Sequence, residues 1–224
     1  MEERYIRNRL HVLPEEQQLL KDFHILLGGA GIGSIIAECA LRFGFENITI
    51  VDGDFVEESN MNRQNYVMED IGNYKSEALR KRLLSINPNA NIFSINRYID
   101  TNNVEEIIRE HNVAINALDF KTDIPLLFDN YCQRHNIPVI HPFNIGWGGL
   151  VFVVEPTGKH VIDLTIENKQ NFEVQIIKQL INNSKYSEPK LWIEKIISQY
   201  LNEKEELPPP QLSIASWITA GLCT

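Results

Sequence analysis

The sequence contains few cysteines, and those it has are far apart. Cys39, Cys132 and Cys223 form neither the even set of a disulfide framework nor a Cys-x-x-Cys pair for zinc. We therefore expect no zinc site. The pattern is typical of buried thiols in a reducing compartment, so the expected location is the cytoplasm.

Long apolar runs and an excess of positive charge are also missing. The first ten residues lack the apolar core of a secretory leader, and no run reaches the roughly 18–20 apolar residues of a membrane-spanning helix. The 224 residues include 21 Lys and Arg against 30 Asp and Glu, a formal net charge of −9. This balance argues against a nucleic-acid or membrane partner, and 43 % apolar residues indicate a globular chain.

What the sequence does contain is an alternation of short apolar strands with amphipathic helices. The expected strands are 24–27, 48–51, 91–95, 113–118, 138–141 and 150–154. The expected helices are 14–22, 35–43, 75–86, 104–111, 124–135, 172–181, 191–200 and 212–223. This order predicts an α/β fold, with a Rossmann-like, mostly parallel sheet and helices on both faces.

The chain is expected to divide near Pro156. Residues 1–156 would form a core with an N-terminal arm, and residues 157–224 a crossover and helical segment that completes the same domain. Because an apolar, helix-like run reaches Thr224, we expect the native protein to continue beyond it.

The first strand leads into a glycine-rich turn and a helix. Gly28, Gly31 and Gly33 let the backbone approach a phosphate closely, and the following helix N-terminus offers unpaired N–H groups. Asp52 ends the next strand, 19 residues after Gly33, where a carboxylate can hold both ribose hydroxyls. The turn therefore indicates a nucleotide. The sequence has no P-loop motif, which argues against an ordinary P-loop ATPase. At this point the nucleotide can still be NAD, FAD or ATP.

The polar stretch that follows favours ATP. Residues 52–75 gather Asn60, Arg63, Gln64 and Lys75 beside the expected phosphates. A nicotinamide dehydrogenase has no evident need for these donors, whereas a triphosphate that is being cleaved requires its charge to be neutralised.

Separated motifs in this region resemble those of the ThiF/MoeB/HesA superfamily, relatives of ubiquitin-activating enzymes that adenylate a carboxylate with ATP. After the glycine turn and Asp52 come Asn60…Arg63-Gln64, Ile71-Gly72-Asn73-Tyr74-Lys75 and Asn87-Pro88, in the order and spacing of the family. The resemblance covers residues 4–156. One departure is Ala30, which stands at the family's second glycine, where a methyl group is expected to crowd the phosphates or to shift the turn.

The resemblance implies a role for each candidate residue. The residues that would contact the nucleotide are Gly28, Gly31, Gly33, Ser34, Asp52, Asn60, Arg63, Gln64 and Lys75. Catalysis would fall to Arg63, Lys75, Asp119 and Arg7. Asp119 would hold Mg²⁺, which needs few protein carboxylates when phosphates supply other oxygens. Arg7 would reach the ATP of a neighbouring subunit, which implies a homodimer.

The expected reaction is ATP-dependent adenylation of a carboxylate with release of pyrophosphate. The resemblance implies the C-terminus of a ubiquitin-like or sulfur-carrier protein as the usual substrate, and peptide and tRNA-linked carboxylates are the other targets that it leaves open. Relatives that transfer the activated substrate to sulfur carry a cysteine in the crossover region. Residues 157–212 contain no cysteine, so we expect that no thioester forms on this chain. Two alternatives remain: a non-catalytic partner subunit, suggested by Ala30 and the missing cysteine, and a dinucleotide-binding oxidoreductase, suggested by the glycine turn and Asp52.

Three residues near the motifs have simpler interpretations. Asp119 is also a candidate N-cap for the helix that follows it, and Asp54 is a candidate turn former. Trp147, between Gly146 and Gly148, is expected to pack inside the protein rather than to contact a substrate.

Overall fold

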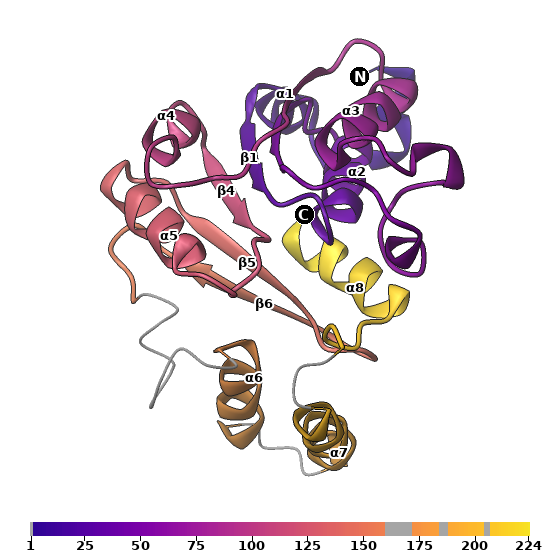
Figure 1. Ribbon diagram of the computed structural model, residues 1–224. Coiled ribbons are helices and arrows are strands. Elements are labelled where there is room, and N and C mark those ends of the chain that lie inside the picture. Colours follow the sequence, from indigo (N-terminus) through magenta and orange to yellow (C-terminus); the bar gives the residue numbers. More distant parts are fainter. Residues whose placement is uncertain (1, 160–171, 184–187, 204–206) are drawn as a thin grey trace.

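A six-stranded sheet runs through the structure in the order β3-β2-β1-β4-β5-β6 (Figure 1). The computed structural model describes residues 2–159, 172–183, 188–203 and 207–224. β1 to β5 are parallel, and β6 is antiparallel to β5. The strands are β1 (His24–Gly28), β2 (Asn47–Val51), β3 (Asn91–Ile95), β4 (Val113–Asn116), β5 (Val139–Asn144) and β6 (Gly149–Val154). The predicted Rossmann-like α/β fold is thereby confirmed.

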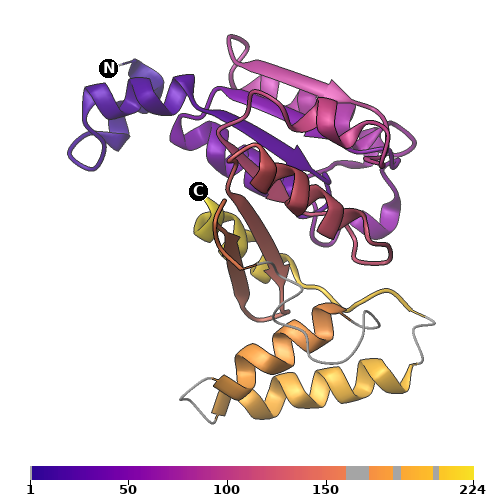
Figure 2. The ribbon, with the colours of Figure 1, turned by 90° about the vertical axis from the view of Figure 1, so that its left-hand side faces the viewer.

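Helices cover both faces of this sheet (Figure 1). α2 and α3 lie on one face with α8, and α4 and α5 lie on the other; α6 and α7 pack together at one end of the molecule (Figure 2). Their bounds are α1 (Pro14–Asp22), α2 (Gly33–Phe43), α3 (Lys75–Ile86), α4 (Val104–Ile108), α5 (Ile124–Arg134), α6 (Phe172–Asn183), α7 (Glu188–Asn202) and α8 (Ser213–Cys223). Within the described ranges the short 3₁₀ helices are η1 (Glu3–Asn8), η2 (Glu58–Asn60) and η3 (Met68–Asp70).

Alternate side chains of the central strand enter two separate cores. Ile25 and Leu27 of β1 pack in the core that α2 and α3 cover, whereas Leu26 between them packs in the core with α4 and α5. Because both faces are buried, the strand is a continuous apolar run rather than an alternation of polar and apolar residues.

Several elements end earlier or later than expected. α4 ends at Ile108 rather than at residue 111, because Glu110 adopts a positive φ of 66°, which a helix cannot accommodate. β4 ends at Asn116, whose side chain turns to donate hydrogen bonds to Asp129 (2.8 Å) and to the carbonyl oxygen of Pro125 (2.9 Å). The division at residue 156 stays a prediction.

The thiols are less uniformly buried than expected. Cys132 is fully buried, whereas Cys39 and Cys223 are half-buried. Burial raises the pKa of Cys132 well above its usual range and that of Cys223 to about 12. Among the described ranges, no helix is both long enough and apolar enough to span a bilayer.

A buried carboxylate joins α2 to α3 and to the polar stretch after β2. Glu38 is 4 % exposed and accepts hydrogen bonds from Arg82 (2.6 Å) and Arg42 (2.8 Å). The side chain of Asn65 donates a further bond to it. Burial alone would raise the pKa of Glu38, but the bonds from these three residues outweigh it, so the pKa is lowered.

Glu38→Gln is expected to lower the free energy of unfolding by about 1–2 kcal/mol at neutral pH, because a charged acceptor of three donors is lost. The folded-state pKa lies below the unfolded value, so this stabilisation is present above the unfolded pKa and is lost as the pH falls through the folded-state pKa. Urea unfolding, with the exposed Glu15→Gln as the control, should show a gap between wild type and Glu38→Gln that shrinks on acidification. A gap independent of pH would contradict this assignment.

Candidate active site

The glycine turn joins β1 to α2 in a conformation that requires glycine at Gly29. Its φ is +93°, and an added Cβ would collide with the carbonyl oxygen of Ala117. At Gly33, an added Cβ would lie 2.7 Å from the side chain of Leu27, so α2 starts unusually close to β1. Among the described residues, the N–H groups of Gly31 and Ile32 have no backbone acceptor. The turn therefore offers free donors at the N-terminus of α2, the arrangement that binds phosphate.

Ala30 does not place its methyl group where the sequence led us to expect. The residue is fully buried, and its side chain belongs to the core beside α2 and α3. Its N–H donates to Asp52 (2.6 Å), and its carbonyl oxygen accepts from the hydroxyl of Tyr66 (2.7 Å). The extra carbon is thus accommodated inside the core rather than on the outer surface of the turn.

Asp52 directly follows β2, and its carboxylate is held by two backbone donors. Oδ2 accepts from Ala30 N–H (2.6 Å) and Oδ1 from Asp54 N–H (2.7 Å). Burial raises the pKa of Asp52, although these bonds oppose the increase. The bonds fix the orientation of the side chain, and each oxygen retains accepting capacity for a ribose hydroxyl.

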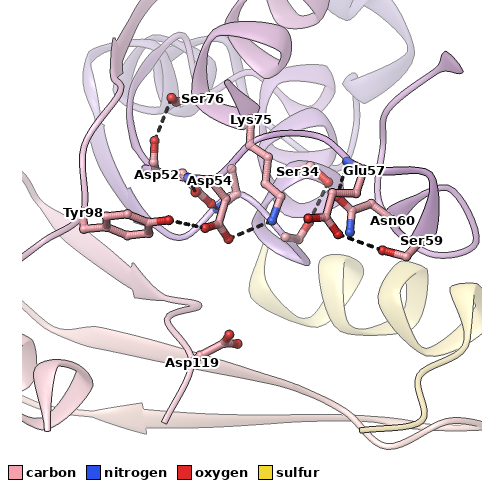
Figure 3. A network of polar contacts seen from close by, with 12 residues as sticks. Ser34, Asp52, Asp54, Glu57, Ser59, Asn60, Lys75, Ser76, Tyr98 and Asp119 are labelled. Atoms are coloured by element: carbon pink, nitrogen blue, oxygen red, sulfur yellow. Dashed lines mark hydrogen bonds and ion pairs between the residues drawn. The ribbon is translucent and has the colours of Figure 1, made fainter. Parts of the chain in front are cut away.

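Lys75, the first residue of α3, is part of a polar network beside Asp52 (Figure 3). It is 8 % exposed, and its Nζ lies 3.0 Å from Oδ2 of Asp54. The hydroxyl of Tyr98 donates to Oδ1 of Asp54 (2.7 Å). Burial would raise the pKa of Asp54, but the bonds from Tyr98 and Lys75 lower it. Asp54 is therefore more than a turn former, since it holds the buried lysine in place.

Arg63 lies on the same polar stretch, just after η2. Its Nη1 donates to the carbonyl oxygen of Ser59 (2.9 Å) and to Oδ1 of Asn62 (2.9 Å), and its Nε donates to the side chain of Gln211. Burial lowers the pKa of Arg63, while the negative charge of Asp119 opposes that effect. The guanidinium is thus partly desolvated and close enough to Asp119 to experience its charge.

The remaining polar candidates have different environments. The carbonyl of the buried Asn60 side chain accepts from Glu57 N–H (3.0 Å) and so shapes η2. The Oε1 atom of Gln64 is buried and has no hydrogen-bond partner among the described residues, although its side chain lies beside Gly31. Ser34, predicted to frame the nucleotide, is instead fully buried, and its hydroxyl donates to Gly31 O (2.7 Å) and accepts from Asn65 N–H (2.9 Å).

Asp119 lies on the loop that follows β4. Its side chain is 79 % exposed, with Lys121 Nζ 3.8 Å away, and Figure 3 shows it standing apart from the Asp54–Lys75 pair. α5 begins at Ile124 with Asp123 as its N-cap, so Asp119 does not cap that helix. Magnesium accepts a single exposed carboxylate when phosphates complete its oxygen shell, and Asp119 fits that requirement. The described residues contain no cluster of three or more His, Cys, Asp or Glu side chains suited to a metal.

Arg7 is not brought to this site within one chain. It is exposed on η1, which is anchored near the amino end of β2 through Tyr5, whose hydroxyl donates to Glu46 (2.7 Å). The glycine turn, Asp52 and Asp119 all follow the carboxyl ends of their strands. Arg7 therefore lies toward the amino ends of the strands, whereas the other candidates lie at their carboxyl ends.

Trp147 lies in the turn between β5 and β6 and is 65 % exposed. The expectation that it packs inside the protein is wrong, because the flanking glycines form a surface turn, with Gly146 at a φ of +81°. The residues at this site that sequence reasoning did not assign are Gly29, Ile32, Asp54, Tyr98 and Gln211. Gly29 carried a signal through its place in the glycine run, and Asp54 through its position two residues after Asp52.

Comparison with known proteins identifies relatives of this chain. A model of the ThiF family matches residues 5–189. The sulfur carrier protein ThiS adenylyltransferase of Bacillus subtilis (strain 168) is 32 % identical over 160 residues, which cover 68 % of this chain and 47 % of the relative. The tRNA threonylcarbamoyladenosine dehydratase of Escherichia coli (strain K12) is 32 % identical over 150 residues, covering 66 % and 54 %. The chain thus spans about half the length of these relatives.

Solved structures show the same fold. E. coli MccB with ATP matches with a TM-score of 0.70 at 21 % identity, over 98 % of this chain and 61 % of that chain. E. coli tRNA N6-threonylcarbamoyladenosine dehydratase in complex with ATP matches with a TM-score of 0.57 at 29 % identity, over 60 % of this chain and 56 % of that chain.

Proposed function

Because the chain belongs to the ThiF family, we propose that it uses ATP to adenylate a substrate carboxylate. The observation that carries the proposal is that Arg63, Lys75 and Asp119 lie on segments that follow the carboxyl ends of β2 and β4, next to the strand whose carboxyl end carries the glycine turn. Two cations, one of them buried and one partly buried, suit the charge of a triphosphate, and a free carboxylate suits Mg²⁺. Relatives named as adenylyltransferases and matching structures with ATP support the same reaction.

In this proposal the chain binds the nucleotide along the carboxyl edge of the sheet. Asp52 receives the ribose hydroxyls, and the free N–H groups of Gly31 and Ile32 face the phosphates. Gln64 can bring an additional polar side chain to the phosphates, because its amide lies against Gly31. The bonds from Ala30 and Asp54 orient Asp52 before ATP arrives, so little reorganisation of that carboxylate is needed.

The chemical step transfers the AMP moiety to the substrate. A carboxylate oxygen of the substrate bonds to the α-phosphorus, the bond from that phosphorus to the bridging oxygen breaks, and pyrophosphate leaves. Arg63 and Lys75 stabilise the charge that develops on the departing phosphates. Asp119 would hold Mg²⁺ against the phosphate oxygens, and the ion would supply further charge neutralisation when bound. The side chains mainly position the reactants, which accounts for much of such rate enhancements.

The proposed substrate is the C-terminal carboxylate of a ubiquitin-like or sulfur-carrier protein. The support is the ThiS adenylyltransferase and the SAMP-activating enzyme E1 of Haloferax volcanii, which is 28 % identical over 161 residues. We propose that no thioester forms on this chain, because the sequence has no cysteine at 157–212 and the thiol of Cys132 is buried with a raised pKa. We propose that Arg7 acts in the nucleotide site of a second copy, in a homodimer. Arg7 lies toward the amino ends of the strands, whereas the nucleotide site of its own chain lies at their carboxyl ends.

Calorimetry and isotope exchange test the proposal in sequence. Titration with MgATP should release heat, whereas NAD(H) should not bind. ATP–pyrophosphate exchange is then measured with a panel of ubiquitin-like and sulfur-carrier proteins, each compared with a form that lacks its C-terminal residue. Exchange that depends on the intact C-terminus supports the proposal. Binding without exchange across the panel would favour a non-catalytic subunit, and binding of NAD(H) alone would favour an oxidoreductase.

A further inference from the structure

The stretch 207–212, between α7 and α8, runs beside the loop that carries Arg63. The side chain of Asn62 donates to the carbonyl oxygen of Gln211 (3.2 Å), and Nε of Arg63 donates to the side-chain oxygen of Gln211. Gln211 is 148 positions away from Arg63 in the sequence, yet its side-chain oxygen accepts the hydrogen bond from Nε of the guanidinium.

The guanidinium of Arg63 is held at two of its three nitrogens. Nε binds Gln211, and Nη1 binds Ser59 O (2.9 Å) and Asn62 Oδ1 (2.9 Å). A guanidinium is planar, so acceptors at two of its nitrogens fix the plane as well as the position. Among the described residues Nη2 makes no hydrogen bond, and its two N–H groups remain available to an anion.

Gln211 is itself held by its neighbour in the chain. The side-chain amide of Asn144, at the end of β5, donates to Leu212 O (2.8 Å) and accepts from Leu212 N–H (3.4 Å). Oδ1 of Asn144 also accepts from Gly146 N–H (3.0 Å), in the turn that carries Trp147. The backbone that follows the Gln211 side chain is therefore fixed, by Asn62 at the carbonyl oxygen of Gln211 and by Asn144 at Leu212.

We propose that Gln211 is a positioning residue, which orients Arg63 so that the free Nη2 group of the arginine faces the β- and γ-phosphates of ATP. The inference rests on the proposed function, since it takes Arg63 to bind those phosphates. An arginine held by three acceptors loses little further rotamer freedom on binding, so more of its interaction with the phosphates appears as affinity. A neutral amide suits this role because it accepts from the guanidinium without cancelling the positive charge.

The test compares the binding of ATP and AMP to Gln211→Met and Gln211→Ala by calorimetry. Both substitutions remove the acceptor, and methionine retains the length of the side chain. Affinity for MgATP should fall about tenfold, as expected for a lost charge-assisted hydrogen bond. Affinity for AMP, which lacks the β- and γ-phosphates, should stay within about twofold. Gln18→Met, on the exposed side of α1, is the matched control and should bind both nucleotides like wild type.

A cycle with Arg63→Ala separates positioning from a general structural role. In the Arg63→Ala background, Gln211→Met should cause no further loss of ATP affinity. An equal loss for ATP and AMP, or an undiminished tenfold loss without Arg63, would overturn the inference. If wild type binds MgATP and Arg63→Ala weakens it while both Gln211 variants match wild type, the inference fails and the proposed function stands. If wild type binds no MgATP, the proposed function itself fails.

Discussion

Arg63→Ala is expected to slow ATP–pyrophosphate exchange about 10²–10³-fold, the usual effect of removing a preorganised group that stabilises charge in the transition state. Partial burial makes the effect large, because the guanidinium acts where water screens charge poorly. The exchange rate is measured with the carrier protein identified by the panel, at saturating MgATP.

The matched control is Arg109→Ala, which removes an exposed arginine that pairs with Glu105 on α4. It should leave exchange unchanged, because an exposed pair of this kind contributes little. Circular dichroism of both variants checks that the fold is retained. Exchange at the wild-type rate by a folded Arg63→Ala protein would remove Arg63 from the proposed site.

Asp119→Asn is expected to slow exchange about 100-fold and to raise the Mg²⁺ concentration needed for half-maximal rate. Asparagine keeps the size of the side chain but removes the negative charge that would hold the cation. Because the side chain is 79 % exposed, the free energy of unfolding should stay within about 0.5 kcal/mol of wild type. A magnesium titration of the exchange rate, together with urea unfolding, measures both effects.

Asp22→Asn, at the end of α1, controls for the loss of one negative charge from an already acidic chain. It should leave the magnesium dependence unaltered. If Asp119→Asn gave the wild-type magnesium curve, the cation would have to be held by another group, and the metal assignment would be wrong.

The parts of the site that follow from local sequence were predictable. Gly33 starts α2 against Leu27, so glycine is needed there for steric reasons that a motif records directly. Asp52 follows its strand immediately, and the parallel order of β1 and β2 brings it to the turn. Apolar runs at strand length were sufficient to predict the sheet, because both of its faces are covered.

The parts that depend on distant contacts were not predictable from these patterns. Tyr98 reaches Asp54 across 44 positions, and Gln211 reaches Arg63 across 148, with no motif at either partner. Ser34 belongs to the glycine motif, yet its hydroxyl is used to join the turn to Asn65. The exposure of Trp147 depends on how the turn between β5 and β6 lies relative to the rest of the molecule, which its flanking glycines do not specify.

The close contact between α8 and β6 has a consequence for the order of folding. An added Cβ at Gly149 would lie 2.4 Å from the hydroxyl oxygen of Thr219, so α8 packs directly against the start of β6, which pairs with β5. Docking closes a loop of more than fifty residues that begins at Val154, and contacts between residues so far apart in the sequence slow folding because the loop has to be closed before they form. Because Leu212 and Gln211 directly precede α8, we expect the surroundings of Arg63 to be completed after the nucleotide turn, whose contacts are local.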